Sequence, residues 1–146
     1  MGRVDFYILP DSSNHFRFVC SLTGKAWQNG NRVFIHTMNR EDAVMLDDML
    51  WTFKDISFIP HAIMEKNSSE NAPVLIGWNH DEPVTSEVLI NLCDTIPDYA
   101  ANFERIVEIV AGSPQQKQLA RNRYRDYRER GYELHDHKIE GDYDNT

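Results

Sequence analysis

The strongest constraint on the fold is an alternation of strand and helix patterns in the first third of the chain. The run 4–9 (VDFYIL) is short, apolar and rich in β-formers, and residues 13–28 then carry apolar side chains at helical spacing. A second apolar run, 32–36 (RVFIH), is followed by another helix pattern, which opens with Asn39 and two acids. Consecutive units of this kind form parallel sheets through right-handed crossovers, so this region predicts an α/β fold.

Three further strand-like runs follow in the second half of the chain, at 74–78, 88–92 and 105–110. Ser113 and Pro114 then supply the N-cap and the first position of a final helix. We predict one three-layer, Rossmann-like α/β domain, in which helices cover both faces of a five-stranded, mostly parallel sheet. The later strands could pair antiparallel, and the sequence leaves the strand order open.

The length of 146 residues is that of a single domain with one hydrophobic core. We assign residues 1–134 to the α/β domain and expect residues 135–146, which are polar and acidic, to form a disordered tail. No apolar run approaches the roughly 20 residues that a membrane-spanning helix needs, and the first residues, MGRVDFYILP, have neither the long apolar region nor the small-residue cleavage site of a signal peptide. We therefore expect a cytoplasmic protein that does not bind membranes.

The common motifs of cofactor binding and catalysis are missing from the sequence. The first strand-to-helix turn, LPDSSNH, lacks the glycines of a dinucleotide fingerprint, and neither a P-loop nor a GxSxG elbow occurs. Cys20 and Cys93 lie far apart, and the clustered His135 and His137 fall in the predicted tail. We expect no catalytic residue, no cofactor and no metal ion. A nucleotide-dependent enzyme is an alternative that rests on the fold alone.

One stretch, 117–130 (KQLARNRYRDYRER), differs sharply in charge from the rest of the chain. Its six basic and two acidic residues give it a charge of +4, which leaves −12 for the remainder of a chain with a net charge of −8. At about 100° per residue, one helical stripe collects Lys117, Arg121, Tyr124, Arg125 and Arg128. The candidate core face holds Leu119, Ala120, Arg123, Tyr127 and Arg130. A solvated basic face is the ordinary interpretation, but like charges four residues apart repel, which favours an anionic ligand.

Several short motifs, collinear along the chain, match one protein family. The stretch QLARNRYRDYRERGYEL follows a strand that ends in IVEIV, and DDMLWTF and SFIPH lie near the middle of the chain. Together with VDFYIL, RVFIH, PVLIGW and VLINL, these motifs resemble the chi subunit of bacterial DNA polymerase III. The resemblance extends to about Leu134 and leaves the acidic tail uncovered. Each motif is weak alone, and their collinearity makes the match specific.

The resemblance implies a non-catalytic accessory subunit of the replicative DNA polymerase III holoenzyme, which meets DNA only indirectly. Its partners would be the psi subunit and the single-stranded-DNA-binding protein, which it would link to the clamp loader. In this family, a pocket beside the last helix takes the partner's acidic C-terminal tail, which ends in phenylalanine. Carried over to this chain, the contacts to carboxylates would come from Lys117, Arg121, Arg125 and Arg128, and the pocket from Val110 and Tyr124, with Trp51 and Phe58 as further walls. Plain core positions are an equal alternative for Val110, Trp51 and Phe58.

A different function for the same helix is direct binding of single-stranded nucleic acid. Its arginines alternate with Tyr124 and Tyr127, which could stack on bases. The charge of −12 elsewhere in the chain opposes this alternative, because nucleic-acid affinity comes largely from phosphates that Lys and Arg neutralise.

Overall fold

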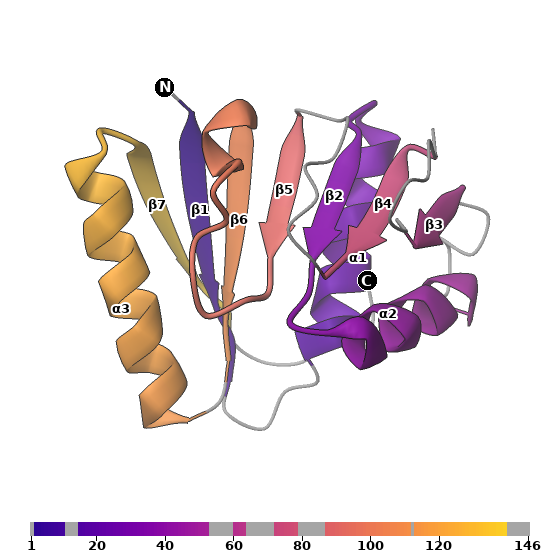
Figure 1. Cartoon of the computed structure of the whole chain (residues 1–146), viewed down its shortest axis with the longest axis horizontal. Coiled ribbons are helices and arrows are strands. Elements are labelled where there is room, and N and C mark those ends of the chain that lie inside the picture. Colours follow the sequence, from indigo (N-terminus) through magenta and orange to yellow (C-terminus); the bar gives the residue numbers. More distant parts are fainter. Residues whose placement is uncertain are drawn as a thin grey trace.

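The computed structural model describes residues 2–10, 15–52, 60–63, 72–78, 87–111 and 113–139. Within these ranges the elements follow one another as β1 (Arg3–Ile8), α1 (His15–Gln28), β2 (Val33–His36), α2 (Arg40–Thr52), β3 (His61–Ile63), β4 (Val74–Gly77), β5 (Val88–Asn91), the 3₁₀ turn η1 (Ala100–Asn102), β6 (Arg105–Val110), α3 (Pro114–Glu129) and β7 (Glu133–Lys138). Figure 1 shows a sheet with helices on both faces, which is the three-layer arrangement that the alternating patterns predict.

The strands of this described part of the chain form one seven-stranded sheet, in the order β3-β4-β2-β5-β6-β1-β7, and every neighbouring pair is parallel. The predicted α/β class is confirmed, but the sheet has seven strands rather than five. The two unpredicted strands are β3, which has three residues, and β7, which reads ELHDHK. Both lie at sheet edges, where a strand is less buried, so neither carries the apolar pattern of a central parallel strand.

The two faces of the sheet carry separate hydrophobic clusters. Helices α1 and α2 cover one face and contribute Val19 and Leu46 to its cluster, and α3 covers the other face and contributes Tyr127. Along β6, Ile106 belongs to the cluster under α3 and Val107 to the cluster under α1 and α2, because successive side chains of a strand point to opposite faces.

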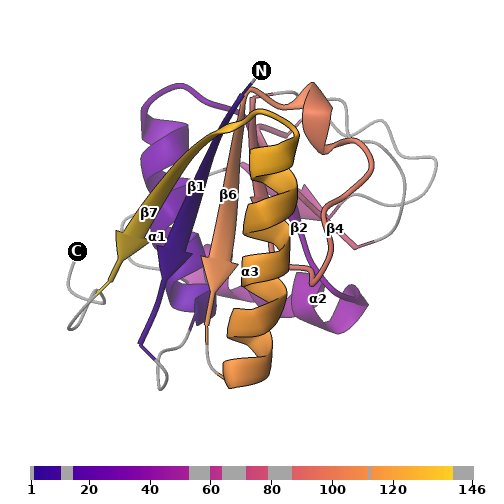
Figure 2. The same ribbon diagram turned by 90° about the vertical axis from the view of Figure 1, so that its left-hand side faces the viewer.

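At one end of the sheet, β1 lies between β6 and β7, with α3 on one side of these strands and α1 on the other (Figure 2). Just beyond the paired residues of β7, the backbone N–H of Ile139 donates to the carbonyl oxygen of Ile8 at 2.8 Å. The predicted domain boundary after residue 134 is therefore wrong, because residues 135–138 are part of the sheet. The remainder of the predicted tail, 140–146, lies outside the described residues.

Candidate functional site

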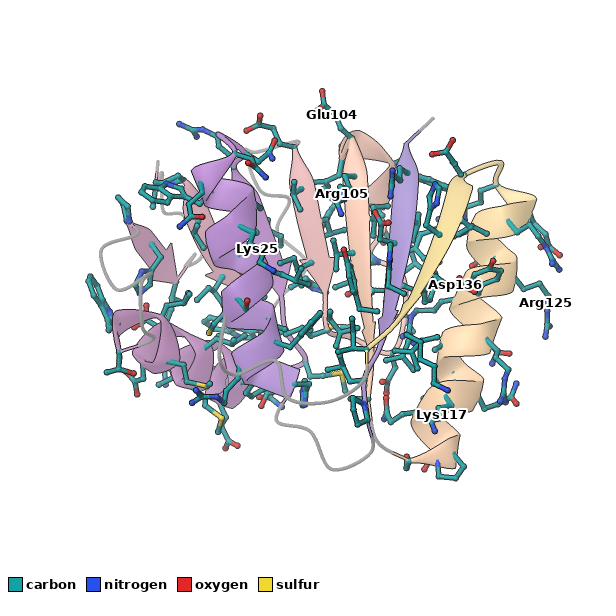
Figure 3. All side chains as sticks on the ribbon, turned by 180° about the vertical axis from the view of Figure 1, so that it is seen from behind. Lys25, Glu104, Arg105, Lys117, Arg125 and Asp136 are labelled. Carbon is teal, nitrogen blue, oxygen red and sulfur yellow. The ribbon has the colours of Figure 1, made fainter. Side chains whose placement is uncertain are left out.

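A hollow of about 450 Å³, which we call the α3 hollow, lies between α3 and the β6-β1-β7 end of the sheet. The residues that line it come from β1, β6, α3 and β7, and they are Phe6, Ile8, Val110, Lys117, Ala120, Arg121, Tyr124 and Asp136. Phe6, Val110 and Ala120 are buried, whereas Arg121 and Asp136 are exposed. The α3 hollow thus has an apolar floor and charged groups at its rim. Figure 3 labels Lys117 on α3 and Asp136 on β7, the elements that form two of its sides.

Local signals at both ends of α3 fix its length. Ser113 is the N-cap, and its Oγ accepts a hydrogen bond from the backbone N–H of Gln116 at 3.2 Å. At the other end, Gly131 has a φ of 91°, and the N–H of Tyr132 donates to the carbonyl oxygen of Tyr127 at 3.2 Å. This is the Schellman arrangement, which glycine allows because it has no Cβ. The turn sends the chain back along the sheet as β7, so that β7 and α3 can form two sides of the same hollow.

A buried polar cluster fixes α3 to the sheet. Glu108 of β6 is fully buried and accepts hydrogen bonds from two α3 side chains, Arg123 Nε at 3.0 Å and Tyr127 Oη at 2.6 Å. Asn91 Nδ2 donates to the same carboxylate at 2.9 Å, and Arg123 Nη1 donates to the carbonyl oxygen of Asp94 at 2.9 Å. Because these groups are all paired in a single arrangement of the helix, the cluster sets the rotation of α3 about its axis and hence which side chains face the α3 hollow.

The electrostatics of this cluster depend on Arg123. Burial raises the pKa of Glu108, and the charge of Arg123, with the hydrogen bonds from Asn91 and Tyr127, opposes only part of that rise. Burial also raises the pKa of Tyr127, and the adjacent carboxylate raises it further, so the phenol acts as a hydrogen-bond donor. Arg123 is therefore the counter-charge that makes a carboxylate tolerable at this depth.

Aromatic rings complete the floor beneath α3. The Phe6 ring lies 5.2 Å from that of Tyr124, at an interplanar angle of 55°, and 6.0 Å from that of Tyr127, at 75°. Such tilted and edge-on pairs are the favoured arrangements of aromatic rings. The Tyr124 ring thereby bridges the helix and the sheet at the edge of the hollow, where it stays half-buried.

The structure brings together some of the predicted site residues and separates others. Of the eight, Val110, Lys117, Arg121 and Tyr124 line the α3 hollow. Two others, Arg125 and Arg128, lie further along α3, are exposed and do not line it.

Trp51 is at the C-terminal end of α2, which packs on β3 and β4 at the opposite end of the sheet. Its side chain is 55% exposed, with its ring 4.3 Å from that of His61. Trp51 is therefore not a wall of this hollow, and Phe58 lies outside the described residues.

Four lining residues were missed by the sequence reasoning: Phe6, Ile8, Ala120 and Asp136. The spacing of Phe6 and Ile8 puts them on one face of a strand, but nothing local tells which helix covers that face. Ala120 was predicted to face the core. That prediction is confirmed for Ala120 and also for Arg123 and Tyr127, while Arg130 is exposed and pairs with Asp126 at 3.2 Å.

A second charged cluster lies on the other face of β1. Asp5 is buried and accepts hydrogen bonds from Arg3 Nη2 and Arg105 Nε, both at 3.0 Å, while His137 Nε2 lies 2.8 Å from Asp5 Oδ1. Burial alone would raise the pKa of Asp5, but the hydrogen bonds from Arg3 and His137 and the charge of Arg105 together lower it to about 2. The His137 ring stacks on Tyr7, 4.6 Å away. The cluster ties β6, β1 and β7 together.

Other chemistry has little support in the described part of the chain. Burial raises the pKa of Cys20 to about 12 and of Cys93 to about 11, so neither thiol is an activated nucleophile. Across the same residues, no group of three or more His, Cys, Asp or Glu side chains could hold a metal ion. None of the described helices is long and apolar enough to cross a membrane.

Comparison with known proteins gives the family. The model of the family "DNA polymerase III chi subunit, HolC" matches residues 1–135. The chain is 38% identical, over 141 residues, to the DNA polymerase III subunit chi of Pseudomonas aeruginosa, a match that covers 95% of this chain and 98% of the relative. It is 33% identical to that of Escherichia coli strain K12, with 92% and 96% covered. The resemblance seen in the motifs is confirmed: the chain belongs to the DNA polymerase III chi subunit family.

Proposed function

We propose that this protein is a non-catalytic accessory subunit of the DNA polymerase III holoenzyme that binds the acidic C-terminal tail of the single-stranded-DNA-binding protein in the α3 hollow. It thereby links that protein to the clamp loader, with the psi subunit as a second partner, and works in the cytoplasm. The observation that supports this function is the composition of the hollow, in which an apolar floor adjoins the cations Lys117 and Arg121.

The chemistry of the hollow suits a peptide that ends in phenylalanine. A phenyl ring can bury its apolar surface against Phe6, Val110 and Ala120, which are themselves buried. The terminal carboxylate then lies near Arg121, whose planar guanidinium can grip it through two parallel hydrogen bonds. In the free protein, Arg121 Nη1 donates to Gln118 Oε1 at 3.2 Å, an exposed contact within the helix that a carboxylate can replace. Acidic side chains further from the terminus would meet Arg125 and Arg128 along the exposed side of α3.

Arg121 provides the sharpest test of this function. Loss of a hydrogen bond to a charged group costs about 1.5–3 kcal/mol, so Arg121→Ala should weaken binding of an acidic, phenylalanine-ending peptide roughly tenfold to hundredfold. The matched control is Arg130→Ala, because Arg130, the C-cap residue of the same helix, is exposed but pairs with Asp126 and does not line the hollow. This variant should bind normally. Fluorescence anisotropy of a labelled peptide measures both.

The carboxylate itself can be tested on the ligand side. A peptide with an amidated C-terminus should bind much more weakly than the free acid, and equal binding would contradict the role given to Arg121. Salt should weaken the complex, because it screens partly exposed charges.

Direct binding of single-stranded nucleic acid is distinguished by titration without any partner. Arg125 and Arg128 are exposed beside the hollow and could meet phosphates. Tight binding of single-stranded DNA whose strength grows with strand length would favour this alternative over the peptide-binding function.

A further inference from the structure

The rim of the α3 hollow is asymmetric in charge. On the helix side stand Lys117 and Arg121, and on the strand side stands Asp136. Asp136 is the β7 residue that pairs with Phe6 of β1, and residues paired across neighbouring strands share a face of the sheet. Leu134, two positions earlier on β7, packs into the cluster beneath α3, which confirms the face. The Asp136 carboxylate therefore stands on the α3 side of the sheet, where it lines the hollow together with Phe6 and Tyr124.

This asymmetry has a consequence for any ligand that carries several negative charges. A carboxylate that approaches from the helix side meets two cations, whereas one that approaches from the strand side meets another carboxylate. Asp136 is exposed, so the repulsion is moderated by solvent, but it acts over a few ångströms beside an apolar surface, where it is not fully screened. The two sides of the hollow thus discriminate between orientations of the same peptide.

We propose that Asp136 is a specificity-determining residue of the α3 hollow, which excludes acidic side chains from its strand side. With the terminal carboxylate at Arg121 on the helix side and the ring on the floor, the residue that precedes the ring extends toward the strand side, where Asp136 stands. That residue must then be uncharged or basic, and the acids that give the ligand its charge must lie further from the terminus. This inference rests on the proposed peptide-binding function and adds a rule for which acidic peptides bind. It gives a reason for Asp136, the one acid among the described residues that line this hollow.

Three peptides test the rule. They share an acidic segment and a free C-terminal phenylalanine and differ only in the residue before it, which is aspartate, asparagine or lysine. For the wild-type protein, the asparagine peptide should bind about fivefold more tightly than the aspartate peptide, the factor expected for like charges about 4 Å apart in water. The lysine peptide should bind at least as tightly as the asparagine peptide. The preference should shrink as salt is added.

The protein variants assign the preference to one carboxylate. In Asp136→Asn, the aspartate and asparagine peptides should bind equally, because the repelling charge is gone while the size of the side chain is kept. The matched control is Glu133→Gln, which removes an exposed acid from the same strand, one that bonds to His135 and does not line the hollow. This control should keep the wild-type preference. Arg121→Ala should weaken all three peptides by a similar factor.

The outcomes distinguish a failure of the role given to Asp136 from a failure of the proposed peptide-binding function. Should Asp136→Asn keep the full wild-type preference, or should the wild-type protein show none, the role of Asp136 is refuted although peptides still bind. Should no peptide bind the wild-type protein, the peptide-binding function itself is refuted, and the rule falls with it. Thermal unfolding of each variant confirms that the fold is intact, as expected for an exposed residue at the edge of the sheet.

Discussion

Arg123→Met would leave a fully buried carboxylate without its counter-charge. Glu108 is 0% exposed and Arg123 is 6% exposed, so solvent screens this pair very little. Removal of one partner from such a buried pair costs about 3–5 kcal/mol. Tyr127 and Asn91 still donate to Glu108 in the variant, so we expect a loss near the lower end of this range, about 3 kcal/mol. Urea denaturation at pH 8, followed by circular dichroism, measures the loss as a change in the free energy of unfolding.

The cost should be smaller at lower pH. Without Arg123, the pKa of Glu108 in the folded protein rises further, because the counter-charge no longer opposes the effect of burial. A carboxyl group whose pKa is raised on folding contributes stability at pH values below its unfolded pKa, and this contribution is lost as the pH rises through the folded pKa. The difference between Arg123→Met and the wild type should therefore be smaller at pH 5 than at pH 8.

Two more variants separate charge from packing. The double variant Glu108→Gln/Arg123→Met removes both charges, so it should recover part of the loss and show no added pH dependence between pH 5 and pH 8. Arg130→Met removes an exposed arginine from the C-cap of the same helix and should change the free energy of unfolding by less than about 1 kcal/mol. A cost below about 1 kcal/mol for Arg123→Met, or an equal cost at the two pH values, would refute the reasoning.

Three other predictions concern single residues. Gly131→Ala places a Cβ at a φ of 91° and should cost about 1 kcal/mol, seen as a lower Tm, whereas an unchanged Tm would show that the turn can relax. The pKa of Asp5 is lowered to about 2, so its contribution to stability is present above its ordinary pKa of 3.8 and is lost as the pH falls toward 2. The Tm of the wild type should therefore drop more steeply between pH 4 and pH 2 than the Tm of Asp5→Asn. Trp51→Ala should leave peptide affinity unchanged, because Trp51 lies at the opposite end of the sheet from the α3 hollow, and a loss of affinity with the fold intact would contradict this placement of the site.

The sequence predicts those parts of the fold whose burial leaves a local pattern. Central strands such as 33–36 and 88–91 are buried at every position, and they read as apolar runs. Strand β7 shows no such apolar run, because it pairs on one side only and all its side chains except Leu134 are charged or histidine. Its place in the sheet is decided by backbone hydrogen bonds to β1, and amino-acid composition does not predict these bonds.

The site is predictable only where one helix determines it. Helical spacing groups Lys117, Arg121 and Tyr124, and the structure indeed gathers them at one hollow. Part of the floor, however, comes from Phe6 and Ile8 of β1, which is more than 100 residues away from α3 in the chain, and no local pattern connects the two elements. The burial of Arg123 shows the same limit: the helical wheel directs it inward, but its partner Glu108 belongs to another element.

The position of β1 has a consequence for how the protein is made. This strand is synthesised before the other described strands, yet its two neighbours, β6 and β7, begin at Arg105 and Glu133. Until about a hundred more residues are synthesised, an apolar strand that ends up in the sheet interior has neither edge paired, which is the kind of long-range closure that slows folding and exposes chains to aggregation. A nascent chain released before Glu133 lacks one wall of the hollow altogether. The proposed peptide binding would thus require that translation has passed β7.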